Sequence, residues 1–252
     1  PRLPVSSGSV KLYVQTGYVR NYGFEAMLSY GHRWGDFGWD SSFTFSANKN
    51  EIVELVKDYV HPETGKTYNV DKLELKTDEG RGFGKAKFIL KEGGTLGDLY
   101  THADLKRDIN GNVLIDDDGN VTAVDNAGDI KLGSVLPKAN LAWNNSFTYK
   151  GINAGFLVTA RLGGIVYSAT QAYLDLYGVS ETSAAARDAG GVWVNDRSQV
   201  NPQSFYSVVA SQSGLPTYYT YSATNVRLQE AHIGYTIPRR WLGNVCDINV
   251  AL

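Results

Sequence analysis

Four stretches of the chain alternate between apolar and polar residues with a period of two, over about ten residues each. Successive side chains of a β-strand point to opposite faces, so each stretch predicts a strand with one apolar and one polar face. The apolar positions are Phe24, Ala26, Leu28 and Tyr30; Phe37, Trp39, Phe43, Phe45 and Ala47; Leu141, Trp143, Phe147 and Tyr149; and Ile152, Ala154, Phe156, Val158 and Ala160.

This alternation fits either a soluble β-sandwich or a piece of a membrane barrel, because both shield one face of every strand from water. Two details favour the barrel. Runs of about ten residues suit a tilted strand that crosses a bilayer, whereas ordinary strands are nearer five or six. Aromatic residues also gather near the expected strand ends, as in the aromatic girdles of such barrels. These residues are Tyr30, Trp34, Phe37, Trp39 and Tyr149. The predicted fold class is therefore all-β, an antiparallel segment of a transmembrane β-barrel.

The composition supports a β-rich chain and argues against several functions. The 252 residues include 16 Tyr, 5 Trp and 27 Gly, which suit strands and turns. A net charge of −2 provides no basic stripe for nucleic acid. No apolar run reaches the roughly 18 residues of a membrane-spanning helix, and the first residues do not resemble a signal peptide. Cys246 is the single cysteine and is expected to pack as a small residue.

Two short turns and two long connections are expected between the strands. Lys150-Gly151 indicates a tight hairpin, and residues 31–38 indicate a turn with a longer connection. The connections near 48–136 and 162–217 are too long to lack structure of their own. Short turns on one side and long loops on the other are typical of outer-membrane barrels.

The long connections are expected to carry short elements. Asn201 is a good N-cap and Pro202 suits the first helical position, so a helix is expected to begin there. Residues 168–177 predict a second helix that ends at Gly178, and the Ala-rich residues 180–187 predict a third. Residues 85–92 are expected to form an edge strand or part of one.

The run from Tyr218 to Pro238 joins an aromatic-rich loop to a strand whose alternation is imperfect. Its apolar residues change parity near Glu230, so a regular strand would turn its apolar face over at that point. A β-bulge there, or a strand that leaves the membrane at one end, would explain the change. The apolar residues before the change are Val226 and Leu228, and those after it are Ala231, Ile233 and Tyr235.

One acidic segment partly matches a calcium-binding loop. Asp108, Asn110 and Asn112 have the spacing of its first three ligands, but Val113 and Gly119 stand where that loop requires Gly and Glu. The preferred interpretation is a pair of tight turns, Asn110-Gly111 and Asp118-Gly119, around a short strand at 113–115. A weak calcium site is the alternative.

The sequence offers little other chemistry. The four histidines lack partners at metal-ligand spacing. Gly80, Gly82 and Gly84 before Lys85 lack the spacing of a phosphate loop and predict a flexible loop. No serine lies in a GxSxG turn. We therefore expect no metal, no cofactor and no enzymatic activity, although distant carboxylate pairs of the glycosidase type stay open.

Several segments follow one another along the chain in a distinctive order, and the most distinctive is Tyr-Ser-Ala-Thr-Asn-Val-Arg-Leu at 221–228, within the run that ends at Pro238. In this order they resemble segments of SusC/RagA-like TonB-linked outer-membrane transporters. Each segment is weak alone, but the ordered set covers nearly the whole chain. The other segments lie at 20–26, 43–55, 97–100 with 108–112, 133–140, 161–167 and 187–192.

The resemblance implies a 22-stranded barrel with an internal plug, in the outer membrane of a Gram-negative bacterium. It implies import of glycans, or in some members peptides, with a SusD-like surface lipoprotein as lid and TonB as the source of energy. The chain would be an internal part of the last third, with about eight strands. The plug, the TonB-contact segment and the final strands would lie outside it.

The long loops of such a transporter would contact cargo and lid. Tyr and Trp have an apolar ring with a polar tip, so they can stack on sugar rings. The alternative for each is packing within the loops. The candidate ligand-binding residues are Tyr167, Tyr173, Trp193, Tyr206 and Tyr218, with Tyr177, Phe205 and Tyr219 as further candidates.

A soluble carbohydrate-binding β-sandwich is the competing interpretation. In a sandwich the apolar faces of the strands would meet in a closed core, whereas in a barrel segment they would stay exposed in the isolated chain. The residues that separate the two are Trp39, Phe43, Trp143 and Phe147.

Overall fold

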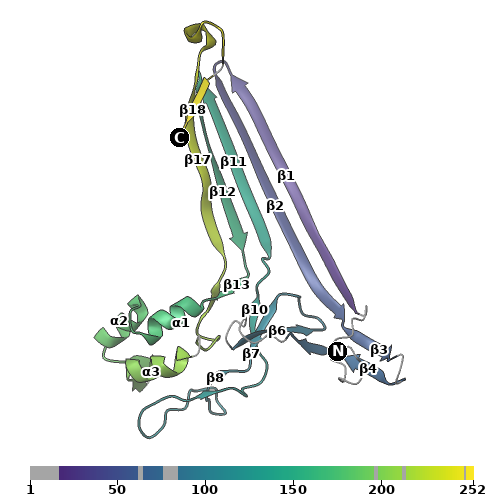
Figure 1. Ribbon diagram of the computed structural model, residues 1–252, viewed down its shortest axis with the longest axis vertical. Coiled ribbons are helices and arrows are strands. Elements are labelled where there is room, and N and C mark those ends of the chain that lie inside the picture. The colour runs from purple at the N-terminus through teal and green to yellow at the C-terminus, as the bar shows by residue number, and fades with distance from the viewer. Residues whose placement is uncertain (1–16, 62–64, 76–84, 196–197, 212–213, 247) are drawn as a thin grey trace.

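A six-stranded antiparallel sheet dominates the computed structural model, which describes residues 17–61, 65–75, 85–195, 198–211, 214–246 and 248–252 (Figure 1). The strands of this sheet follow the order β1-β2-β11-β12-β17-β18. They are β1 (Tyr18–Trp34), β2 (Phe37–Glu54), β11 (Ala139–Tyr149), β12 (Ile152–Leu162), β17 (Asn225–Ile237) and β18 (Ile248–Ala251). We call this sheet the wall.

The register of the wall brings the alternating apolar residues onto one face. Leu28 lies opposite Phe43, Phe43 opposite Trp143, Trp143 opposite Val158, and Val158 opposite Leu228. We call the side that carries this row the apolar face and the other side the polar face. The neighbouring row on the polar face holds Ser29, Ser42, Asn144, Leu157 and Glu230.

The apolar face of the wall is open to its surroundings. Leu28 is 73% exposed and Leu228 64% exposed, although both are large apolar residues. Phe43 and Trp143 are exposed, and Trp39 and Phe147 are partly exposed. The expectation that these four rings stay out of a closed core is therefore confirmed.

The expected β-bulge is present in β17. Leu157 pairs with Glu230 while the next residue, Val158, pairs with Leu228, so Gln229 is the extra residue. One extra residue shifts the parity of the strand. As a result, Val226 and Leu228 on one side of the bulge and Ile233 on the other all lie on the apolar face.

Two-residue hairpins close the wall at one end. Lys150 and Gly151 have φ of +46° and +89°, so the predicted tight turn is confirmed. The turn at 31–38 is shorter than expected, because β1 and β2 continue pairing up to Trp34 and Phe37. Tyr149 lies opposite Phe37, which places both hairpins at the same end.

The long connections gather at the opposite end of the wall (Figure 1). β1 and β2 contain 17 and 18 residues, longer than the runs of about ten that alternation predicts. The connection expected near 48–136 therefore begins after Glu54 and extends to residue 138. The second, expected near 162–217, occupies 163–224. We call the described residues of these two connections the loop body.

The three predicted helices are present in the second connection, and each begins with an N-cap, of which the one at Asn201 was expected. The Ser168, Ser180 and Asn201 side chains accept hydrogen bonds from backbone N–H groups in the first turn that follows. Gly178, with φ of +69°, follows the first helix. The helices are α1 (Ala169–Leu176), α2 (Glu181–Asp188) and α3 (Pro202–Val209).

The first connection contains a four-stranded sheet in the order β10-β7-β6-β5. The strand expected over 85–92 is β6, but it lies between β5 and β7 rather than at an edge. These strands are β5 (Lys72–Glu74), β6 (Ala86–Lys91), β7 (Asp98–Thr101) and β10 (Ile130–Ser134). The remaining pairs are β3 (Val56–Val60) with β4 (Thr67–Val70), β8 (Asp104–Leu105) with β9 (Ala123–Val124), β13 (Ile165–Tyr167) with β16 (Thr220–Ser222), and β14 (Val192–Val194) with β15 (Ser198–Val200).

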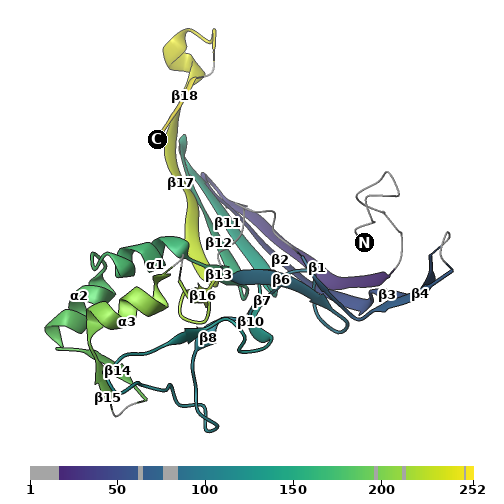
Figure 2. The same cartoon turned by 60° about the horizontal axis from the view of Figure 1, so that its bottom comes forward.

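Both connections contribute to one hydrophobic core. Figure 2 shows the helices and β14–β15 next to β8 of the first connection. Loop segments far apart in the sequence therefore form a single packed unit. Its buried residues are Ala103, Leu105, Val113 and Val121 from the first connection, and Ala172, Val194, Val200, Phe205, Val209, Ala210, Leu215 and Tyr219 from the second.

The wall is narrower than expected. It has six strands rather than about eight. Within the described residues it closes no barrel and leaves β1 and β18 as edges. A short 3-10 helix, η3 (Arg239–Leu242), separates β17 from β18. None of the helices among the described residues is long and apolar enough to cross a membrane.

Candidate ligand-binding site in the loop body

An open pocket of about 430 Å³ lies between α3, β14 and the segment that leads into β16. Three of the five predicted ligand-binding residues line it together: Trp193, Tyr206 and Tyr218. Arg107 from the first connection, and Asp175 and Tyr221 from the second, also line it. The pocket thus combines flat aromatic surfaces with charged groups of both signs.

The cap of α3 sets the aromatic side of the pocket. The Asn201 side chain accepts hydrogen bonds from the backbone N–H groups of Gln203 and Ser204, at 2.9 and 3.3 Å. Phe205 is buried one turn later, and its ring meets Tyr206 and Tyr218 edge-on, with centroids 5.4 and 6.0 Å apart. Burial raises the pKa of both tyrosine hydroxyl groups.

Arg107 is held at the pocket by a buried carboxylate. Its Nε donates to Asp104 Oδ2 at 2.9 Å, and its terminal nitrogen donates to the carbonyl of Gly111. Thr217 donates to the other oxygen of Asp104 at 3.0 Å. The hydrogen bond to Asp104 raises the pKa of Arg107, and the side chain is partly preorganised for a polar ligand.

Asn195 joins the two connections beside Trp193. Its side-chain oxygen accepts from the N–H of Val113 at 2.8 Å, and its side-chain nitrogen donates to the carbonyl of Val113 at 2.7 Å. This pair imitates a strand pairing and satisfies both backbone groups of a buried residue. It fixes the distance between Arg107 and the aromatic side of the pocket.

Asp175 is buried, and its hydrogen bonds link α1, α2 and Tyr219. One carboxylate oxygen accepts hydrogen bonds from Ser180, Gln171 and Thr182, and the other accepts from the Tyr219 hydroxyl at 3.0 Å. Burial and the nearby carboxylate raise the pKa of Tyr219. Tyr219 is thus held within the core at a position that also lines the pocket.

Three other predicted aromatic residues, Tyr167, Tyr173 and Tyr177, lie apart from this pocket. Tyr167 lines a neighbouring pocket of about 550 Å³, and its hydroxyl lies 3.4 Å from the carbonyl of Gly214. Burial raises the pKa of Tyr167 to about 12. Tyr173 is exposed on α1, and Tyr177 is 76% exposed after it. Phe205 and Tyr219 belong to the core and also line the pocket.

Sequence reasoning missed Arg107, Asn195 and Tyr221. Tyr221 lies in the same tyrosine-rich run as Tyr218, so the aromatic clustering was a usable signal. Arg107 and Asn195 are separated by 88 positions in the sequence, and no local pattern connects them. Only the shared core of the loop body brings them to one place.

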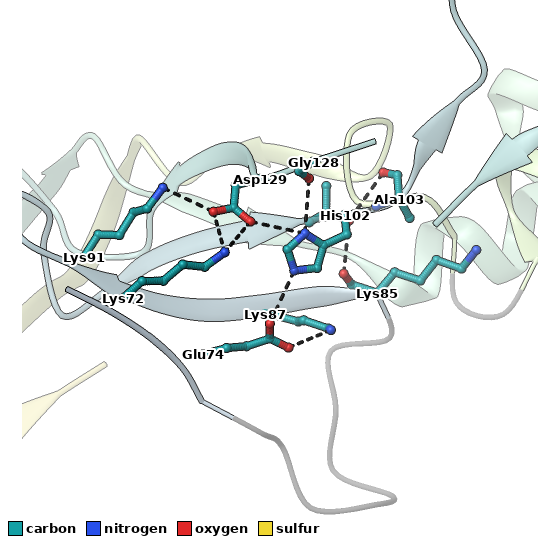
Figure 3. A network of polar contacts seen from close by, with 10 residues as sticks. Lys72, Glu74, Lys85, Lys87, Lys91, His102, Ala103, Gly128 and Asp129 are labelled. Atoms are coloured by element: carbon teal, nitrogen blue, oxygen red, sulfur yellow. Dashed lines mark hydrogen bonds and ion pairs between the residues drawn. The ribbon is translucent and has the colours of Figure 1, made fainter. Parts of the chain in front are cut away.

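A network of charged side chains links the strands of the four-stranded sheet in the loop body (Figure 3). The Asp129 carboxylate pairs with Lys72 and Lys91 at 2.6 and 3.2 Å, and Glu74 pairs with Lys87 at 2.7 Å. These hydrogen bonds lower the pKa of both acids. His102 lies between Glu74 and Asp129. Its Nε2 is 3.4 Å from the Glu74 carboxylate, and its Nδ1 is 3.4 Å from the Asp129 carboxylate.

The acidic segment forms the two expected turns. The Asp108 carboxylate accepts hydrogen bonds from the N–H groups of Asn110 and Asn112, and Asp116 accepts from those of Asp118 and Asn120. Instead of a continuous strand over 113–115, Val113 forms an isolated bridge with Arg107, and Ile115 forms another with Val121. Among the described residues, no group of three His, Cys, Asp or Glu side chains could hold a metal ion. Gly80, Gly82 and Gly84 lie outside the described residues.

No protein-family model matches the chain. It is 25% identical over 260 residues to TonB-dependent receptor P3 of Formosa agariphila, a match that covers 96% of this chain and 24% of that protein. It is 24% identical over 277 residues to TonB-dependent receptor P39 of the same organism, covering 98% of this chain and 27% of that protein. TonB-dependent receptor P26 is 26% identical over 182 residues, with coverage of 66% and 17%.

The chain spans about a quarter or less of the length of these curated relatives. All three relatives carry the name TonB-dependent receptor, and the β-rich wall is consistent with this name. Together they support the TonB-dependent receptor family for this chain.

Proposed function

We propose that this chain forms part of the wall and external loops of a TonB-dependent transporter in the outer membrane of a Gram-negative bacterium. The observation that carries the proposal is the exposed apolar face of the wall. A soluble protein rarely leaves so large an apolar surface uncovered, whereas lipid would cover it. The role is transport rather than catalysis.

The height of the apolar face agrees with a bilayer. From the row of Phe24 to the row of Trp34 there are ten residue steps along β1. At about 3.3 Å per residue this is roughly 33 Å along the strand, and a tilt of about 40° reduces it to roughly 25 Å. That is the height of the apolar band of outer-membrane barrels. Trp34, Phe37, Tyr149 and Tyr235 share the last row, where an aromatic girdle belongs.

The finer assignment follows the resemblance of the sequence motifs. We assign the chain to the SusC/RagA-like group, as an internal part of the last third of a 22-stranded barrel. The plug and the final strands would belong to other parts of the protein. TonB would act through a segment outside this chain, and a SusD-like lipoprotein would cover the loop body.

The cargo in this proposal is a glycan or another bulky nutrient such as a peptide. Trp193, Tyr206 and Tyr218 would stack on sugar rings, and Arg107 would donate hydrogen bonds to them. Tyr167 and Tyr173 would contribute from outside the main pocket.

The test uses the intact transporter that contains this chain, purified in detergent, with oligosaccharide binding followed by calorimetry. Trp193→Ala should weaken binding about tenfold, because it removes an exposed stacking surface without opening the core. Tyr177→Ala is the matched control, since this exposed ring lies outside the pocket. Equal affinity in all three proteins would refute the pocket assignment.

The alternative of a soluble carbohydrate-binding sandwich has a separate test. A sandwich would be monomeric and sharply folded without detergent. The chain, with its exposed apolar face, should instead aggregate or require detergent.

A further inference from the structure

Two arginines lie next to each other on the polar face of the wall. Arg161 of β12 pairs with Asn225 of β17, and Thr159 pairs with Arg227. Arg161 and Arg227 are therefore diagonal neighbours on adjacent strands, with their Cα atoms about 7–8 Å apart. Like charges in such positions repel each other unless an anion lies between them.

Neither arginine has an acid partner in the described part of the chain. The ion pairs there involve other residues, and Arg161 donates from a terminal nitrogen to the carbonyl of Val135 at 2.6 Å. Glu25 lies in the same row as Arg161 but three strands away. At about 4.8 Å per strand this is roughly 14 Å, too far for an ion pair.

Polar atoms beside the arginines also lack partners. The Thr159 hydroxyl and Arg161 Nε are both buried without a hydrogen bond among the described residues. Unpaired buried polar atoms are costly, so a ligand that accepts from both would be favoured. Both residues, with Arg227, line an open pocket of about 740 Å³ on the polar face.

The position of this pocket connects it with the loop body. Arg161 is one residue from the end of β12 and also lines the neighbouring pocket that contains Tyr167. A molecule that leaves the loops along the polar face would meet Arg161 and then Arg227. The arginine pair is thus accessible from the side on which cargo would arrive.

We propose that Arg161, Arg227 and Thr159 bind an anionic group of the cargo, namely a carboxylate, sulfate or phosphate. The arginines supply charge and donors, and the Thr159 hydroxyl donates a further hydrogen bond. The proposal rests on the transport function and adds a chemical class of cargo. An acidic side chain from another part of the same protein is the competing occupant.

The first experiment measures binding of inorganic sulfate and of acetate to the intact transporter in detergent. Ionic strength is held constant with chloride. Arg161→Gln/Arg227→Gln should weaken sulfate binding at least about tenfold, because two charge-assisted hydrogen-bonding groups are lost. Arg227→Gln alone should produce part of this loss, and the exposed position of this side chain makes a loss of stability small. Acetate compared with sulfate shows which oxyanion is preferred.

Arg33→Gln is the matched control, since Arg33 is an exposed arginine on the same face at the hairpin end. It should leave sulfate binding unchanged. Equal loss in Arg33→Gln and the double variant, or no binding to the wild type, would overturn the proposal. A lower unfolding temperature of the double variant without any anion, together with unchanged sulfate binding, would indicate an internal acid and would also overturn it.

A second arm separates this inference from the transport function. Neutral oligosaccharides should bind the double variant as well as they bind the wild type, whereas oligogalacturonate should lose affinity. If neutral and acidic oligosaccharides bind the wild type equally and the variants do not differ, only the anion site fails. If sulfate binds but no oligosaccharide does, glycan cargo fails while the anion site stands.

Discussion

The wall and the loop body both contain large apolar residues, but the loop body buries these residues and the wall exposes them. In the loop body, Val209 and Leu215 are almost fully buried within one core. In the wall, Leu28 and Val226 are largely exposed, and the strands are held together by backbone pairing. In the proposed transporter, the loop body would meet water, whereas the apolar face of the wall would meet lipid.

The largest difference between the two regions should appear at the core of the loop body. Phe205→Ala removes a buried ring from the shared core and should lower the free energy of unfolding of the loop body by about 3–5 kcal/mol. Tyr177→Ala, at an exposed ring, should change it by less than about 0.5 kcal/mol. Urea unfolding followed by limited proteolysis of the loops measures both. A similar cost for the two variants would contradict a packed loop core.

The wall should instead be sensitive to charge on one face only. Leu28 lies near the middle of the apolar face, and Ser29 is its neighbour on the polar face. Leu28→Arg should destabilise the protein in lipid vesicles by about 2–4 kcal/mol, because the charge would enter the bilayer. Ser29→Arg should cost close to nothing. Equal costs at the two positions would remove the distinction between the faces.

A polar pair on the apolar face provides a finer test. Trp39 Nε1 donates to Asn145 Oδ1 at 3.1 Å, and Asn145 is only 2% exposed. Trp39→Phe should cost about 1–3 kcal/mol, because it leaves a buried amide oxygen unpaired. Trp39→Phe/Asn145→Leu should recover most of that loss, since both polar partners are gone. Unfolding of the three proteins in vesicles measures the difference; no recovery in the double variant would contradict the pairing.

The smallest expected effect is an acid response confined to the loop body. Glu74 and Asp129 have pKa values lowered by their lysine partners. Such groups stabilise the fold above their unfolded pKa values, about 4.3 for Glu and 3.9 for Asp, and this stabilisation is lost as the pH falls through their lowered folded values. The unfolding midpoint of the loop body should therefore decrease as the pH falls from about 5 through those lowered values. Lys87→Gln/Lys72→Gln should flatten this response; an unchanged slope would exclude the network as its cause.

The wall was more predictable from the sequence than the loop body. A period of two fixes which residues share a face, so Phe43, Trp143 and Val158 could be placed before any pairing was known. The switch of apolar residues from even to odd positions near Glu230 also indicated a bulge, because one extra residue is the smallest change that returns them to one face. The lengths of β1 and β2 were not predictable, since their polar ends lack alternation.

The pocket could be predicted only in part. The Asn201 cap, the stop at Gly178 and the Ala-rich run at 180–187 are local signals, and they placed the helices correctly. Trp193 and Tyr206 were identified as aromatic candidates, but their convergence with Arg107 depends on contacts between distant connections. A sequence pattern carries no information on such contacts. The same limit applies to Phe205 and Tyr219, which line the pocket and also belong to the core.

The most direct test of the account is which face of the wall meets lipid in the intact protein. Single cysteines at residues 27–30, 42–45 and 142–145 would be introduced after Cys246→Ser, spin-labelled, and measured for accessibility to oxygen in lipid and to a water-soluble nickel complex. We predict a period of two, with Leu28, Phe43 and Trp143 accessible to oxygen and Ser29, Ser42 and Asn144 accessible to nickel. Uniform accessibility to nickel on both faces would contradict a membrane wall.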